Sequence, residues 1–296
     1  MIQVNPNLLR IEADNGHSVQ FGYTPGFIVG RIDDLSAVSV SISTTQAVGQ
    51  IGATVHGQSV QGKRIAISGE IICTDESIVL DAEMDGKRKQ LLYTIVPQVG
   101  VKLIYNDVWE TAGVVTESPS FRVVGVGVLA YRFELFIPNP YWSFVQGTST
   151  LVAGLEATFY FPRNFGMPYS FGKRLDSATV DVANEGNVPV EMRVIFRALS
   201  TLRDPYIHNT LTGERIGFNN LEMQPRDVLT LDLTTRPVTA VLQRGEEIIS
   251  VIGRLNTPFT RIDLQPGSNV LAGGAGVNPG GVHVEIEKRI MFTAPC

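Results

Sequence analysis

Apolar and polar residues alternate along most of this chain, and that pattern predicts β-strands. In residues 37–43, Val38, Val40 and Ile42 are separated by serines, so we expect a half-buried strand with these three side chains on its inner face. Residues 63–72 alternate in the same way. The other strands expected in the first half of the chain are 8–12, 18–23, 101–106, 113–117 and 121–137.

Residues 76–95 are the one stretch with a helical pattern. Acidic residues gather in its first half and Lys87, Arg88 and Lys89 in its second, the arrangement that suits the helix dipole. Pro97 ends the segment. The basic triplet can be read as a binding patch, but the solvated face of the helix is favoured. The apolar stripe at helical spacing consists of Met84, Leu91, Leu92 and Ile95.

Residues 44–62 break the alternation. They hold four glycines among Gln, Thr and Ser, and their large apolar residues are Val48, Ile51, Val55 and Val60. With so little to bury against its own domain, the segment is either a flexible loop or an arm that becomes ordered on a neighbouring subunit. The pattern by itself slightly favours the loop.

The second half of the chain predicts short strands and no helix. Turn sequences such as Asn184-Glu185-Gly186-Asn187 separate the strands, and this spacing is typical of a β-sandwich or jelly roll. Residues 273–281 are expected to form a loose glycine-rich loop. The expected strands are 157–161, 178–182, 190–197, 206–209, 214–218, 228–232, 238–242, 248–252, 259–264 and 282–292.

The segment Pro138-Asn139-Pro140-Tyr141-Trp142 separates the two series of strands. Its two prolines fix backbone angles and remove hydrogen-bond donors, so a strand cannot continue through them. Tyr141 and Trp142 combine large apolar areas with polar tips, which suits a half-solvated junction. We interpret the segment as the seam between two β-rich domains, 1–142 and 143–296. The alternative is an ordinary loop corner whose aromatic residues belong to one core.

Composition narrows the classes of function. The chain has 296 residues, 18% of them charged, and a net charge of -5. Weak acidity argues against nucleic acid as a partner, and no apolar run is long enough to cross a membrane. The first residues have neither a basic start nor an apolar core, so we expect no signal peptide. The few charges fit a surface partly covered by partners, and equally a Ser/Thr/Asn-rich surface of a large β protein.

The sequence contains no recognised catalytic, metal-binding or cofactor-binding motif. Its four histidines lack a second metal ligand at a known spacing, and no phosphate-binding loop or nucleophile elbow is present. We therefore expect no catalytic residue, no metal and no cofactor, and we do not expect an enzyme. Cys73 and Cys296 are expected to form no disulfide. An alternative function is saccharide binding, with Tyr160, Tyr169 and Phe171 as candidate glycan contacts, although these aromatics also suit the end of a sandwich.

Several segments, taken in order, resemble one family, the distal tail (Dit) proteins of long-tailed siphophages. Each segment is weak alone, and it is their order over about residues 37–270 that makes the resemblance specific. The chain departs from the family pattern at Pro225-Arg226-Asp227, where a glycine is expected before the aspartate. No large insertion interrupts the second domain. The resembling segments are 61–65, 69–71, 87–92, 103–105, 138–142, 184–189, 205–207, 209–214 and 264–269.

The resemblance implies a mainly β fold with two sandwich domains. The N-terminal, ring-forming domain would carry one helix and an extended hairpin arm at about 43–62, and the C-terminal domain would be a galectin-like, jelly-roll sandwich. Candidate contacts between subunits in the arm are Val48, Gly49, Ile51, Val55 and Val60.

The resemblance also implies a structural role in a virion. Six copies would close into a ring that joins the tail tube to a tail-tip protein, a tail-associated lysin or a baseplate protein, as the hub of the host-adsorption apparatus. The protein would be assembled in the bacterial cytoplasm and located at the phage tail tip. The alternative is a carbohydrate-binding module, in which the C-terminal domain recognises a host cell-surface saccharide. Neither role requires nucleic acid or a membrane.

Overall fold

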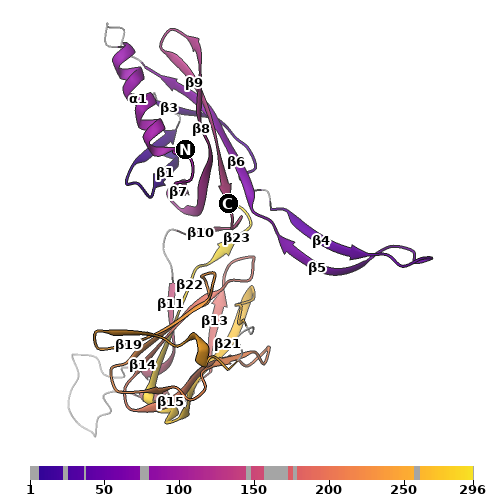
Figure 1. The fold of residues 1–296 in the computed structure, drawn as a ribbon, viewed down its shortest axis with the longest axis vertical. Coiled ribbons are helices and arrows are strands. Elements are labelled where there is room, and N and C mark those ends of the chain that lie inside the picture. Colours follow the sequence, from indigo (N-terminus) through magenta and orange to yellow (C-terminus); the bar gives the residue numbers. More distant parts are fainter. Residues whose placement is uncertain are drawn as a thin grey trace, which may run out of the picture. The chain divides into compact units, whose positions relative to one another are not determined.

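The computed structural model describes residues 7–22, 26–36, 38–73, 80–144, 148–156, 173–175, 179–256 and 261–295. The chain divides into two compact units (Figure 1). Unit 1 comprises Met1–Val145 with Phe292–Cys296, and unit 2 comprises Gln146–Met291. Strands make up most of the described residues, so the expected mainly β fold is confirmed.

Unit 1 is built on one sheet that closes on itself. Pairing between β8 and β9 joins the two ends of the strand order β8-β7-β1-β2-β3-β6-β9, so the expected N-terminal sandwich takes the form of a barrel. Alternate side chains of β6, including Ile65, Ile67 and Ile71, are fully buried inside it. The strands are β1 (Asn7–Ala13), β2 (Ser18–Gly22), β3 (Phe27–Ile32), β6 (Lys63–Ile72), β7 (Gly100–Tyr105), β8 (Trp109–Gly125) and β9 (Val128–Ile137).

Helix α1 (Leu80–Thr94) packs against the barrel core through Leu91 and is followed by the buried Ile95. Leu92, which the apolar stripe includes, is instead exposed. Lys87 and Lys89 form ion pairs with acidic residues one turn earlier in the helix, each at 2.6 Å. The two lysines of the triplet are therefore engaged by their own helix, and the Arg88 guanidinium lies over the Phe121 ring of β8.

The strands of unit 1 differ from the prediction in two places. Residues 121–137 are not one strand, because β8 and β9 meet there in a tight hairpin at Val126 and Gly127, and Gly127 adopts a positive φ of 70°. β3 was also not predicted, since its sequence lacks a clear alternation between its two faces.

The last residues of the chain complete unit 1. β23 (Met291–Phe292) lies next to β10 (Trp142–Phe144) at one end of the strand order. The Phe292 ring meets the rings of Trp109 and Phe144 at centroid distances of 5.1 and 5.4 Å. Residues far apart in the sequence thus form one aromatic cluster.

The described residues of unit 2 form two sheets, as expected for a sandwich, and the core lies among their inward-facing residues. β17 (Glu222–Met223) pairs with β15, and the short helices are η1 (Ile252–Arg254) and η2 (Pro279–Gly281). In order across the first sheet, the strands are β12 (Lys173–Leu175), β11 (Thr148–Glu156), β22 (Val282–Lys288), β14 (Met192–Ala198), β18 (Val228–Asp232), β19 (Thr239–Arg244) and β20 (Glu247–Ser250). The second sheet has β13 (Thr179–Asn184), β21 (Gly267–Val277), β15 (Leu202–Asn209) and β16 (Arg215–Gly217).

The prediction of a loose glycine-rich loop at 273–281 is wrong. Residues 273–277 belong to β21 and pair with β15, while the earlier residues 267–272 of the same strand pair with β13. A Cβ at Gly273 would lie 3.0 Å from Val284 of the other sheet, and one at Gly274 would lie 3.2 Å from the Tyr206 hydroxyl. Glycine occurs here because neighbouring groups approach the backbone closely, not because the segment is loose.

The strand expected at 259–264 is also not found in its described part. Residues 261–263 have no strand, and Leu264 forms only a single bridge with Val190. The strand expected at 157–161 lies outside the described residues, while β11 just before it was not predicted.

Candidate assembly arm and its base

Residues 38–62, which we call the arm, form a hairpin that leads into β6. β4 (Val40–Thr45) and β5 (Thr54–Val60) make a two-stranded sheet of their own, and Figure 1 shows it standing clear of the barrel strands. Every side chain of both strands is exposed. The prediction for 37–43 is therefore right about the strand and wrong about its half-burial. An isolated two-stranded ribbon is only marginally stable in water.

The two faces of the ribbon differ in chemistry. Residues opposite each other in a register share a face, and the pairs Val40–Val60, Ile42–Gln58 and Thr44–Val55 alternate with the pairs Ser41–Ser59, Ser43–Gly57 and Thr45–Thr54. One face thus carries all the large apolar side chains of the two strands, and the other carries hydroxyl groups and glycine. A register shift between Ser43 and Thr44 accommodates His56, whose ring hydrogen-bonds to the Thr45 hydroxyl.

The arm also lacks charge. Residues 38–62 contain no Asp, Glu, Lys or Arg, although 18% of the whole chain is charged. Exposed edge strands in soluble proteins are usually protected from pairing with other chains by charged residues or proline. The arm has neither, so it resembles a surface that is normally covered.

The end of the arm is an ordered turn. The Gln50 side chain accepts a hydrogen bond from the Ala47 amide and donates one to the Thr54 hydroxyl, both at 3.0 Å. The Gln46 side chain donates to the Gln50 carbonyl, also at 3.0 Å. Val48 and Ile51 stand fully exposed on this turn. The flexible-loop alternative for 44–62 is therefore not what the structure contains.

The base of the arm is tied to the barrel at one carbonyl group. The Leu35 carbonyl accepts hydrogen bonds from the Lys63 amine at 2.8 Å and from the Trp142 indole at 3.0 Å. Lys63 is 7% exposed, and its burial lowers the pKa of the amine to about 8, against the opposing effect of the Asp34 carboxylate. The Gln61 amide donates to the Ser39 carbonyl at 2.9 Å and closes the two strands.

This base was not predicted from the sequence. Lys63 lies two and four residues before Ile65 and Ile67, so the alternation of the strand places all three side chains on the same, buried face. The role of the Leu35 carbonyl could not be predicted from the sequence, because every residue has a backbone carbonyl.

The proposed seam residues differ in how deeply the structure buries them. Pro138 and Asn139 are exposed, and the Asn139 side chain accepts a hydrogen bond from the Tyr141 amide at 3.2 Å. Pro140 is buried and Trp142 is 0% exposed within the core of unit 1. The expected half-solvated position of Trp142 is therefore wrong, since its one polar group is satisfied by Leu35. The role of 138–142 as a seam stays a prediction.

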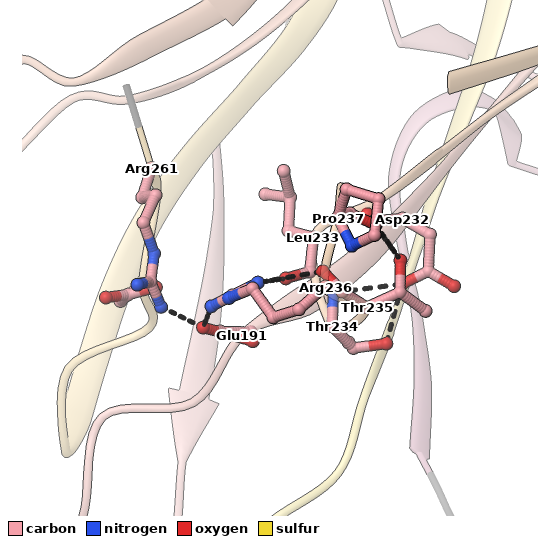
Figure 2. A network of polar contacts seen from close by, with 9 residues as sticks. Glu191, Asp232, Leu233, Thr234, Thr235, Arg236, Pro237 and Arg261 are labelled. Atoms are coloured by element: carbon pink, nitrogen blue, oxygen red, sulfur yellow. Dashed lines mark hydrogen bonds and ion pairs between the residues drawn. The ribbon is translucent and has the colours of Figure 1, made fainter. Parts of the chain in front are cut away.

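A polar cluster in unit 2 holds the segment that follows β18. Figure 2 shows Arg236 and Arg261 directed at Glu191, which hydrogen-bonds to both. Nearby, burial raises the pKa of Asp232, but hydrogen bonds from Thr234 and Arg193 outweigh it and leave that pKa lowered. The carboxylates and arginines of the cluster satisfy one another, so we assign it a structural role.

Other candidate chemistry adds little. Tyr160, Tyr169 and Phe171, the candidate glycan contacts, lie outside the described residues. Among the residues that are described, no cluster of His, Cys, Asp and Glu could hold a metal ion, and no helix is long and apolar enough to cross a membrane.

Comparisons with known proteins bear on the fold. No family model matches the chain, and no curated protein matches its sequence. The crystal structure of the SPP1 Dit protein, described as a paradigm of the hub adsorption apparatus in phages that infect Gram-positive bacteria, matches with a TM-score of 0.67 and 11% identity. The match covers 96% of this chain and 99% of that one. The phage p2 baseplate structure with strontium matches with a TM-score of 0.46 and 10% identity, over 95% and 97% of the two chains. The expected likeness to the distal tail proteins is thus confirmed for the fold.

Proposed function

We propose that this chain is a distal tail protein of a siphophage, a structural hub at the tip of the virion tail. The observation that carries the proposal is the likeness to the SPP1 Dit protein over nearly the whole length of both chains. A likeness confined to one β-sandwich would carry less, because that architecture serves many functions.

The arm supports an assembly role. The ribbon is exposed and uncharged and has one apolar face, so burial of that face against another molecule would stabilise it. When identical subunits contact one another through two different patches, they form a closed ring if the rotation between neighbours divides a full turn evenly. In this proposal six copies form the ring, residues 1–142 build it, and residues 143–296 form the galectin-like domain. The ring joins the tail tube to a tail-tip or baseplate protein.

The test is the mass of the particle, in solution and in assembled tails, for the full chain and for an arm deletion. Ser41 and Ser59 are directly opposite in the register, so replacing residues 42–58 with the dipeptide Asn-Gly closes a shorter hairpin with a two-residue turn. The full chain should form a ring, and the deletion should give folded monomers.

A matched control removes an exposed apolar side chain elsewhere. Ile248→Thr in β20 of unit 2 should assemble like the parent, since it leaves the arm intact. A full chain that stays monomeric both in solution and in tails would refute the hub. Rings formed by the deletion variant would refute the role of the arm. Saccharide binding is the competing function, and binding of a monomeric full chain to host cell-wall saccharide in calorimetry would favour it.

A further inference from the structure

The chain leaves unit 1 and returns to it beside the same strand. It passes into unit 2 after Val145 and comes back at Phe292, and β23 lies next to β10. We propose that this exit and the base of the arm open and close together as one cooperative element, joined through the Trp142 side chain. The proposal goes beyond the proposed function and depends only on contacts within unit 1, so either can fail without the other.

Three aromatic rings hold the exit. The Phe144 ring lies 4.7 Å from the Trp109 ring, and the Phe292 ring meets both of them edge-on. We call these three residues the exit cluster. β10 pairs with β8 over only two residue pairs, Ser143 with Glu110 and Phe144 with Trp109. Because so short a pairing gives little stability, the rings supply much of what keeps β10 in place.

The first residue of β10 reaches the base of the arm. Trp142 is wholly buried, and its indole N–H donates to the Leu35 carbonyl at 3.0 Å. The Lys63 amine donates to the same carbonyl at 2.8 Å and lies 5.5 Å from the centre of the Trp142 ring. Leu35 precedes the first strand of the arm, and Lys63 follows the second. One side chain of the exit strand therefore contacts both chain ends of the arm.

Burial makes these contacts depend on one another. If β10 moved away, the Trp142 ring would leave a cavity in the core, and the Leu35 carbonyl would lose one of its two donors. If the arm base opened instead, the indole N–H would be buried without its acceptor. Packed groups of this kind adopt discrete arrangements, and a coupling between two sites acts equally in both directions. A loss of stability at the exit should therefore appear at the arm base.

The test perturbs the exit cluster and measures hydrogen exchange at the arm base in the full-length protein. Phe292→Ala removes a ring that is only partly buried, so the fold should be kept. Two amides report on the arm base. The Asp33 amide donates to the Ala66 carbonyl and the Gln61 amide to the Ser39 carbonyl, both at 2.9 Å. Mass spectrometry follows exchange in peptides that contain these amides and in peptides from β10, at a concentration where all variants sediment alike.

We expect Phe292→Ala to speed exchange about fivefold or more in β10 and about threefold or more at Asp33 and Gln61. Phe121→Ala is the matched control. It also removes a partly buried ring that packs on the core of unit 1, but one near the opposite end of β8 from Trp109. Exchange at the arm base should then stay within about 1.5-fold of the parent, because distant sites act independently.

A third variant removes the link itself. Trp142→Phe keeps an aromatic ring in the core but has no N–H for the Leu35 carbonyl, which keeps its bond from Lys63. In this background Phe292→Ala should still speed exchange in β10, and should change it at the arm base by less than about 1.5-fold.

Four results would overturn the proposal. Phe292→Ala could speed exchange in β10 alone, which would show that the two places open separately, or in neither place, which would show that the exit cluster does not hold β10. Phe121→Ala could have the same effect at the arm base, which would indicate a general loss of stability. The arm base could also respond equally with and without the Trp142 indole. The first three comparisons use the parent background, so they decide the proposal even if Trp142→Phe does not fold.

Discussion

The buried amine of Lys63 allows a sharp test of how the arm is rooted. The perturbation is Lys63→Met, which keeps an unbranched side chain of similar length and removes the charge. The Leu35 carbonyl keeps its hydrogen bond from the Trp142 indole at 3.0 Å, so no buried acceptor is left unpaired. The substitution therefore isolates the effect of burying the amine.

The size of the expected change in the free energy of unfolding follows from the pKa of Lys63. Burial lowers the pKa of Lys63 from 10.5 to about 8, so between those values the unfolded chain binds the proton more tightly than the folded one. The contribution of Lys63 to the stability of the parent should rise with pH across that window and be flat below it. A tenfold difference in proton affinity between the two states corresponds to about 1.4 kcal/mol, so the whole difference gives an upper bound of about 3.5 kcal/mol. The bound is an upper one because the cation also gains from the Leu35 carbonyl and from the Trp142 ring, 5.5 Å away.

The assay is urea unfolding of parent and variant at several values between pH 7 and 10. We expect Lys63→Met to be more stable than the parent at pH 7, and the difference to shrink as the pH approaches 10. Lys89→Met is the control. A hydrogen bond with Asp85 raises the pKa of Lys89, so this amine stays charged over the pH range. The free energy of unfolding of Lys89→Met should therefore differ from that of the parent by the same amount at every pH. The reasoning would be refuted if the free energies of unfolding of Lys63→Met and the parent changed in parallel with pH, or if Lys63→Met were clearly less stable than the parent at pH 7.

Two further predictions concern the backbone. A Cβ at Gly62 would lie 2.6 Å from the Phe136 ring, so Gly62→Ala should lower the free energy of unfolding by about 1–3 kcal/mol. Gly57→Ala, with no atom within 4 Å of its Cβ, should change it by less than about 0.5 kcal/mol, and equal effects in urea titrations would contradict the close packing at the arm base. Arg226 has a φ of 77° at the position where the resemblance expects glycine, so Arg226→Gly should stabilise unit 2 by about 0.5–1 kcal/mol. A lower melting temperature in calorimetry would count against strain there.

Alternation is a good guide to where strands occur and a poor guide to what covers them. It predicts β6 and β18 at their observed bounds, because a period of two is the direct mark of a pleated strand. The same pattern at β4 predicts half-burial, although the apolar face of that strand is open. An apolar face looks the same in sequence whether its own core or another molecule covers it.

Glycine and aromatic residues are harder to interpret. The glycines of β21 have low strand propensity, yet packing against Val284 and Tyr206 places them in a central strand. Trp142 is wholly inside unit 1 because its indole finds the Leu35 carbonyl, a partner distant in the sequence. In both places a tertiary contact outweighs the local preference.

By itself, the sequence determined that the chain is mainly β, where most strands and the helix lie, and that residues 38–62 carry no charge. These properties depend on local periodicity and composition, which are present in the chain before it folds. Only the tertiary structure decided that the N-terminal sheet closes through β8 and β9 and that the arm is an ordered, two-faced ribbon. Only it joined Leu35, Lys63 and Trp142 at the base of that ribbon. Register and burial depend on which distant segments meet, and the pattern of a single segment does not contain that information.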